Sequence, residues 1–275
     1  MSELSRLMGI LSSRHPSVAL YVWLRRLVLR LGHLIGEVLI FVVEICRQII
    51  SPPFRLRSIL YQVDFIGSQS FFVTVVAAFF TGAVFGLQIG HIFSMFRSQS
   101  LIGAITCDAL TRELSPLITG FLMAGRVGSS MTAEVAAMKF TEQIDALKVM
   151  AVSPMSYLVV PRVVGSLIAI PALNIVFLLL GSVGAFMASK YFFYVDYGTF
   201  IHHTLHIVTM ADLVLGFWKS VVFAAVISIT SCYFGMKAQK GKGGISVSTT
   251  QSVVTALLLI LILDALITFM DIVIL

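Results

Sequence analysis

The sequence is dominated by long runs that contain no charged residue. Residues 65–96, 163–189 and 243–263 lack Lys, Arg, Asp and Glu, and residues 213–236 contain only Lys219. Because a transmembrane helix needs about 20 apolar residues, each run predicts one membrane span. A further apolar stretch, residues 101–138, is long enough to span but carries several charges. The pattern predicts five transmembrane helices, at residues 66–90, 102–134, 162–189, 213–236 and 250–274.

The distribution of Lys and Arg predicts how these spans are oriented. Eight arginines precede the first span, and three basic residues lie in each of the connections 139–162 and 237–242. The opposite connections contain only Arg97 and Lys190. Cytoplasmic segments carry an excess of Lys and Arg, so we expect the N-terminus to be cytoplasmic and the C-terminus to lie outside.

The first 55 residues differ in character from the rest of the chain. Within residues 18–50, polar side chains recur at spacings of three, four and seven, at Arg26, Arg30, His33, Glu37, Glu44 and Gln48. Such spacing places them on one face of an amphipathic helix, which favours a position in the cytoplasmic interface. The alternative is a sixth span whose polar stripe faces a partner. We therefore expect an all-α membrane protein, with an interfacial region at 1–55 and a transmembrane domain at 56–275.

Composition excludes several classes of protein. Hydrophobic residues make up 58% of the 275 residues and charged residues 12%, against roughly 25% charged in soluble domains. This excludes a soluble enzyme, a disordered chain and a nucleic-acid binder, despite the net charge of +6. The three cysteines, Cys46, Cys107 and Cys232, lie too far apart for zinc spacing. His202, His203 and His206 fall in an expected outer loop without a nearby carboxylate, so we expect neither a metal site nor a cofactor.

The second span carries polar residues on one face of its predicted helix. They fall within an arc of about 100° and comprise Asp108, Arg112, Ser115, Thr119, Arg126, Ser130 and Glu134. Intramembrane charges are costly and normally face a cavity or a partner, so Arg112 and the adjacent Glu113 are candidates for lining a functional cavity. The alternative is structural ion pairing, for example Asp108 with Arg112, and pairing is favoured for Arg126 and Glu134. Pro116 is expected to kink the helix.

Small residues repeat at every fourth position in two of the predicted spans. These ladders consist of Gly82, Gly86 and Gly90 in the first span, and Gly125, Ser129, Ala133 and Ala137 in the second. Such repeats allow two helices to approach closely, within one chain or between copies. We expect Gly125, Gly128, Ser129 and Ala133 to take part in helix packing.

A short amphipathic helix is predicted at about residues 140–151, between the second and third spans. Its expected apolar face comprises Phe140, Ile144, Leu147 and Ala151, and its charged face Glu142, Asp145 and Lys148. Ser153 and Pro154 end it. The helix is either an interfacial connector or a docking surface for a cytoplasmic protein.

Three separated motifs resemble the signature of the MlaE/YrbE permease family. They are RELSPLITGFLMAGRVGSSMTAE at 112–134, TEQIDALKVM at 141–150 followed by YLVVPR at 157–162, and GGISVSTTQSVV at 243–254. The resemblance extends from about residue 55 to the C-terminus. Ser115 departs from it, because the family usually has Gly at this position.

The resemblance implies an all-helical permease subunit of an ABC-type lipid transporter in a bacterial inner membrane. Members of the family form homodimers, bind two cytoplasmic ATPases, and deliver or receive a phospholipid or another hydrophobic molecule through a periplasmic MCE-domain protein. This chain has no G-x-x-x-x-G-K-[ST] phosphate loop, so the resemblance assigns ATP hydrolysis to another subunit and no enzymatic activity to this one.

Several residue roles follow from the same resemblance. The coupling helix that contacts the ATPase would comprise Thr141, Glu142, Gln143, Asp145, Ala146, Leu147 and Lys148, with its apolar face in a groove of the ATPase. Arg112 and Glu113 match the charged pair near the lipid cavity, where a guanidinium can bind a phosphate. Asp264 in the last span is expected to pair with Arg112.

Two other functions remain open at this level. Glu113, Arg112 and Asp264 would also suit an ion-coupled secondary transporter, which needs no ATPase. A non-transporting membrane scaffold would use the amphipathic helices as docking surfaces. Co-purification with an ATPase favours the permease, and activity that depends on a proton gradient favours the carrier.

Overall fold

The computed structural model describes residues 36–49, 55–239, 241 and 243–274. Among these residues it contains helices and no strand, which confirms the all-α class. The chain divides into two units, Met1–Ile50 and Ser51–Leu275. In the first unit a helix covers residues 36–49. The remainder of the predicted amphipathic segment lies outside the described residues, and its interfacial position stays a prediction.

Four long helices of the second unit are apolar enough to cross a membrane. They are α3 (Leu56–Met95), α8 (Val160–Phe193), α10 (Met210–Lys237) and α11 (Gly244–Ile274). Each coincides with a predicted span but extends beyond it, because helical geometry continues past the apolar core into the flanking residues. Four of the five predicted spans are thus confirmed as helices of membrane-spanning length and composition.

The second predicted span is also helical but is assembled from five shorter pieces. They are α4 (Ile102–Ala109), a π turn η2 (Leu110–Leu114), α5 (Ser115–Met123), a second π turn η3 (Ala124–Gly128) and α6 (Ser129–Phe140). At about 1.5 Å per residue this run is longer than the hydrocarbon core, which is about 30 Å thick. Its charges and its interruptions distinguish it from the four long apolar helices.

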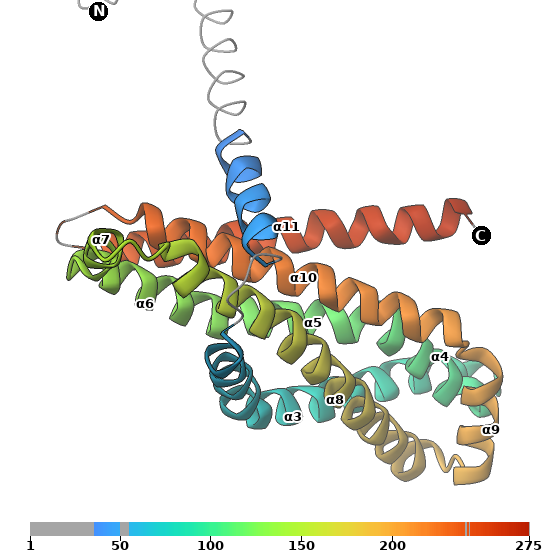
Figure 1. Cartoon of the computed structure of the whole chain (residues 1–275). Coiled ribbons are helices and arrows are strands. Elements are labelled where there is room, and N and C mark those ends of the chain that lie inside the picture. Colours follow the sequence, from blue (N-terminus) through green and yellow to red (C-terminus); the bar gives the residue numbers. More distant parts are fainter. Residues whose placement is uncertain (1–35, 50–54, 240, 242, 275) are drawn as a thin grey trace, which may run out of the picture. The chain divides into compact units, whose positions relative to one another are not determined.

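Short helices also lie in the connections between the long helices. After α6 come α7 (Gln143–Val149) and a π turn η4 (Met155–Val159). Between α8 and α10 lies α9 (Tyr197–Ile207), whose first turn is capped by Asp196. The expected outer loop around His202 is therefore a helix. Figure 1 shows α7 at one end of the second unit, with α4 and α9 at the other.

Glycines set the close approach of α3 to α8. A Cβ on Gly82 would overlap the carbonyl oxygen of Gly181, and a Cβ on Gly184 would overlap that of Phe79. The small-residue ladder of the first span therefore packs within one chain. Larger side chains fill the remaining space, with Ile66, Met123, Ile170, Phe223 and Ile260 completely buried in a core shared by α3, α5, α8, α10 and α11.

Candidate functional site

A buried lysine lies at the centre of a polar cluster inside the second unit. Lys219 of α10 is 0% exposed, and its Nζ lies 2.6 Å from Glu113 Oε2, 2.8 Å from Thr268 Oγ1 and 2.9 Å from Asp264 Oδ1. The Thr268 hydroxyl also lies 3.0 Å from Glu113 Oε1. These four side chains, the Lys219 cluster, join the π turn η2 to α10 and α11.

A second cluster forms around Arg112. Its Nη2 lies 2.6 Å from Asp271 Oδ2, and its Nε lies 3.6 Å from Asp212 Oδ1. Asp212 also stabilises the start of α10. Its Oδ2 accepts a hydrogen bond of 2.8 Å from the Thr209 backbone N–H, as part of a capping box. The Arg112 cluster, made of Arg112, Asp212 and Asp271, therefore links η2 to the first turn of α10 and the last turns of α11.

The two clusters lie at successive depths near one end of the second unit. Asp212 and Lys219 are seven residues apart on α10, as are Asp264 and Asp271 on α11, so about 10 Å of helix separates the clusters. They occupy the first half of α10 and the second half of α11, away from α7 (Figure 1). Together they hold two cations and four carboxylates, so both cations are already neutralised.

The predicted pairing of Arg112 with Asp264 is wrong. Asp264 contacts Lys219, and Arg112 contacts Asp271 and Asp212 instead. The reason is geometric, because Arg112 and Glu113 are adjacent in a π turn and their side chains reach different depths. The alternative pairing of Arg112 with Asp108 is likewise replaced by the contacts to α10 and α11.

The π turn at Leu110–Leu114 positions both predicted cavity residues. A π turn widens the helix and often occurs at functional sites. It ends directly before Ser115 and Pro116, where the proline lacks the backbone N–H of a regular α-helix. The α-helical pattern is thus interrupted directly before Pro116 by this π turn, and a kink at Pro116 itself stays a prediction.

Ser115 uses its hydroxyl to connect neighbouring helices. The side chain is buried, and its Oγ donates to Asn174 Oδ1 and lies 3.1 Å from the Asn174 carbonyl oxygen on α8. Asn174 Nδ2 in turn donates to the Gly216 carbonyl oxygen at 3.4 Å. Ser115 and Asn174 therefore connect α5, α8 and α10 directly beside the two clusters.

Of the two charges nearer to α7, Glu134 forms a structural ion pair as predicted, whereas Arg126 contacts polar side chains that carry no charge. Arg162 is buried, and its Nη2 lies 2.9 Å from Glu134 Oε2 while its Nη1 donates to the Leu158 carbonyl oxygen at 2.8 Å. Arg126 donates to the Ser70 hydroxyl of α3. These side chains join neighbouring helices and lie apart from the Lys219 and Arg112 clusters.

Helix α7 presents a different face from the one expected for docking. Ile144 is buried against Val135 and Leu158 of its own chain, and Leu147 packs against the same residues. Ile144 therefore cannot fill a groove of another protein, and that part of the expectation is wrong, whereas a contact of half-buried Leu147 with another protein stays a prediction. The exposed apolar residues are instead Val149 at 88% and Met150 at 63%. The other predicted coupling residues, Thr141, Glu142, Gln143, Asp145, Ala146 and Lys148, are all exposed.

The predicted packing residues of the second span divide into two groups. A Cβ on Gly128 would lie 3.1 Å from Ser231 Oγ, so Gly128 packs against α10 within the chain. A Cβ on Gly125 would meet nothing within 4 Å. Ser129 and Ala133 are only partly buried. A role for Gly125, Ser129 and Ala133 in contacts with a second copy stays a prediction.

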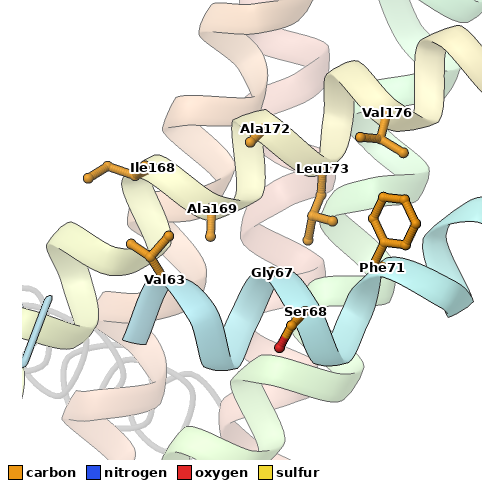
Figure 2. Close-up of a pocket in the computed structure, with 9 residues that line it drawn as sticks. All are labelled: Val63, Gly67, Ser68, Phe71, Ile168, Ala169, Ala172, Leu173 and Val176. Atoms are coloured by element: carbon orange, nitrogen blue, oxygen red, sulfur yellow. The ribbon is translucent and has the colours of Figure 1, made fainter. Parts of the chain in front are cut away.

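An apolar groove of about 280 Å³ lies between α3 and α8. Figure 2 shows its lining, with Val63 and Phe71 on α3 facing Ile168 and Val176 on α8. Ser68 is the one hydroxyl-bearing residue of the nine that line it, and its side chain points away from α8. No charged side chain lines the groove, so it is chemically distinct from the two clusters.

Comparison with models of protein families identifies the family of this chain. The model of the family described as Permease MlaE matches residues 59–270, which is most of the chain. The chain belongs to the MlaE permease family. The match covers α8, α10, most of α3 and α11, and the interrupted segment that carries Arg112 and Glu113.

Relatives of this MlaE-family chain are named as probable ABC transporter permease proteins. It is 38% identical to a probable ABC transporter permease protein of Rickettsia felis, over 85% of this chain and 90% of that protein. It is 33% identical to one of Synechocystis sp., over 92% and 93% of the two chains. The protein is therefore a multi-pass membrane permease of an ABC transporter, which implies a partner ATPase.

In this MlaE-family permease the predicted cavity residues Arg112, Glu113 and Asp264 do lie in one region. Sequence reasoning missed four further members of the two clusters, Lys219, Thr268, Asp212 and Asp271. Two features of the sequence could have pointed to these residues. Lys219 is the only charge in residues 213–236, and the last span contains two aspartates rather than one.

Proposed function

We propose that this permease acts as a homodimer in a bacterial inner membrane and moves a phospholipid or another hydrophobic molecule. The cargo would pass between the membrane and a periplasmic MCE-domain protein. A separate cytoplasmic ATPase would supply the energy. The N-terminus is assigned to the cytoplasm because of the excess of Lys and Arg in the connections on that side.

The observation that carries the proposal is the pair of charge clusters within the spans. Ionisable groups inside a membrane are expensive and mark transport pathways by default. Here six of them, with Thr268, hold η2, α10 and α11 together at one end of the second unit. Three elements that are joined at this end by ion pairs can separate and rejoin there, as a gate for a large amphipathic cargo requires.

The clusters also constrain how a phosphate could bind. Arg112 is 32% exposed, but both sides of its guanidinium already contact carboxylates. A lipid phosphate that binds Arg112 through Nη2 would have to displace Asp271 of α11. Binding of the cargo headgroup and release of α11 from η2 then become a single event.

The opposite end of the second unit supplies the proposed ATPase contact. Helix α7 rests on Val135 of α6 and Leu158 of η4 through Ile144, so a push on α7 reaches α6 and the π turn that leads into α8. Val149 and Met150 offer an exposed apolar contact, and Asp145 and Lys148 form an exposed ion pair beside them. These residues replace the buried face as the proposed docking surface.

The test is purification of the tagged chain in mild detergent from its native membrane, followed by mass spectrometry of bound proteins and lipids. We expect an ATPase in stoichiometric amount, an MCE-domain protein and an enriched lipid class. The double variant Val149→Glu, Met150→Glu should lose the ATPase. Leu205→Glu, the same kind of change at an exposed position of α9, should retain it.

A second candidate function rests on the same clusters. Four carboxylates and two cations at membrane depth would also suit a carrier driven by an ion gradient. A folded chain that purifies without an ATPase, and whose transport in vesicles stops when the proton gradient is dissipated, would replace the first proposal with this one.

A further inference from the structure

The outer helix α9 places histidines in an arrangement that a loop would not provide. His202, His203 and His206 lie within Tyr197–Ile207, a regular helix with an aspartate cap. Side chains four residues apart in a helix are neighbours on one face, and two histidines so placed can bind one metal ion. The expected loop around these residues is therefore replaced by a helix.

The contacts between the rings match this helical spacing. The His202 and His206 ring centroids lie 4.7 Å apart, and both residues are exposed. His203 meets His202 edge to face, with centroids 5.5 Å apart, and lies about 100° further round the helix. His202 and His206 thus form a pair that opens to solvent, and His203 lies beside the pair rather than within it.

The electrostatic surroundings of the pair suit a cation. The helix Tyr197–Ile207 contains no Lys or Arg, so no fixed positive charge on it opposes binding. His206 lies in the last turn, where the carbonyl ends of the peptide dipoles give a helix partial negative charge. A metal ion held by His202 and His206 would lie close to this negative end.

We propose that His202 and His206 bind a divalent transition-metal ion on the outer face of the protein. Imidazole is a ligand for Zn²⁺, Cu²⁺ and Ni²⁺, whereas Mg²⁺ and Ca²⁺ prefer oxygen ligands. Among the described residues no three His, Cys, Asp or Glu side chains converge, so the protein supplies two ligands and water completes the coordination. This proposal does not depend on the proposed transport function.

The test is isothermal titration of the full-length protein with ZnCl₂ and with NiCl₂, in detergent and with an affinity tag that contains no histidine. We expect one site per chain for each metal and no binding of MgCl₂. His202→Ala and His206→Ala should each weaken binding by roughly 100-fold, because one ligand replaces a linked pair. His203→Ala is the matched control and should bind as the wild type does.

Two outcomes would overturn the proposal. One is a wild-type protein that binds neither metal, and the other is an affinity that His206→Ala leaves unchanged or that His203→Ala abolishes. Circular dichroism of each variant shows whether it is folded, and all three positions lie on an outer helix away from the main core. The double variant His202→Ala, His206→Ala should lose the site entirely while remaining helical.

Discussion

Removal of the Lys219 ammonium group is the most direct test of the charge clusters. In Lys219→Met, Glu113 and Asp264 lose their cation and Thr268 loses a hydrogen-bond donor. Breaking a buried ion pair by removing one partner typically costs about 3–5 kcal/mol. Because Glu113 is 36% exposed and water can solvate it, we expect the lower value, about 3 kcal/mol.

The assay is thermal unfolding in detergent, followed with a dye that fluoresces on reaction with thiols. Cys107 and Cys232 are buried and react only when the bundle opens, whereas exposed Cys46 gives a constant background. For a chain of this size a loss of about 3 kcal/mol lowers the Tm by about 6–12 °C. Lys190→Met, at an exposed lysine, is the matched control and should change stability by less than about 0.5 kcal/mol.

Neutralising the partners provides the decisive comparison. The triple variant Lys219→Met, Glu113→Gln, Asp264→Asn contains no unpaired buried charge, so it should recover most of the lost stability. A Lys219→Met protein with an unchanged Tm would refute the reasoning. So would a triple variant that is less stable than Lys219→Met alone.

Three further changes test the geometry around the clusters. In double-mutant cycles on unfolding, Arg112→Gln should couple to Asp271→Asn by about 1 kcal/mol, but should add to Asp264→Asn within about 0.5 kcal/mol. Ser115→Ala should destabilise by about 1–3 kcal/mol in the same thermal assay, because it leaves a buried amide oxygen without its donor. Gly82→Ala should lower folded yield on size-exclusion chromatography, because its methyl group would overlap a backbone carbonyl of α8.

Each of these changes has a control in the same chain. Ser68→Ala removes an exposed hydroxyl that bonds only its own helix, and should leave the Tm unchanged. Gly125→Ala adds a methyl group where nothing lies within 4 Å, so the monomer should fold normally. Equal effects of the test and control variants would show that the contacts described here do not determine stability. Coupling of Arg112 to Asp264 instead of Asp271 would restore the pairing expected from the sequence.

The long spans were predictable from the sequence because hydropathy alone determines them. An uncharged apolar run such as residues 65–96 is unfavourable in water. In lipid it forms a helix, because a helix makes all backbone hydrogen bonds within the segment. The polar face of the second span was visible for a related reason, since buried charges stand out against an apolar background. This is why Arg112, Glu113 and Asp264 were found without knowledge of the fold.

The pairing of those charges was not predictable, because it depends on how α10 and α11 pack beside η2. A regular 100° per residue assigns one direction to Arg112, and the π turn changes that direction. Helix α9 was missed although Asp196, which caps its first turn, was visible as a helix-start signal. The face of α7 was misassigned because amphipathic periodicity does not show whether an apolar face meets its own chain or another protein.

The π turns at Leu110–Leu114 and Ala124–Gly128 have a consequence for how the length of this segment can vary during evolution. A π turn accommodates one residue more than an α turn, so each resembles a retained single-residue insertion. Deleting the extra residue of a π turn would let that turn close to an ordinary α turn, and the helix on both sides would keep its register. Deleting a residue from a regular α-helical part of residues 102–140 would instead rotate one side of the helix by about 100° relative to the other and shift it by about 1.5 Å. Contacts such as those of Arg112 with its carboxylates would then be lost, although no side chain had been substituted. Natural deletions in this segment should therefore fall within the two π turns.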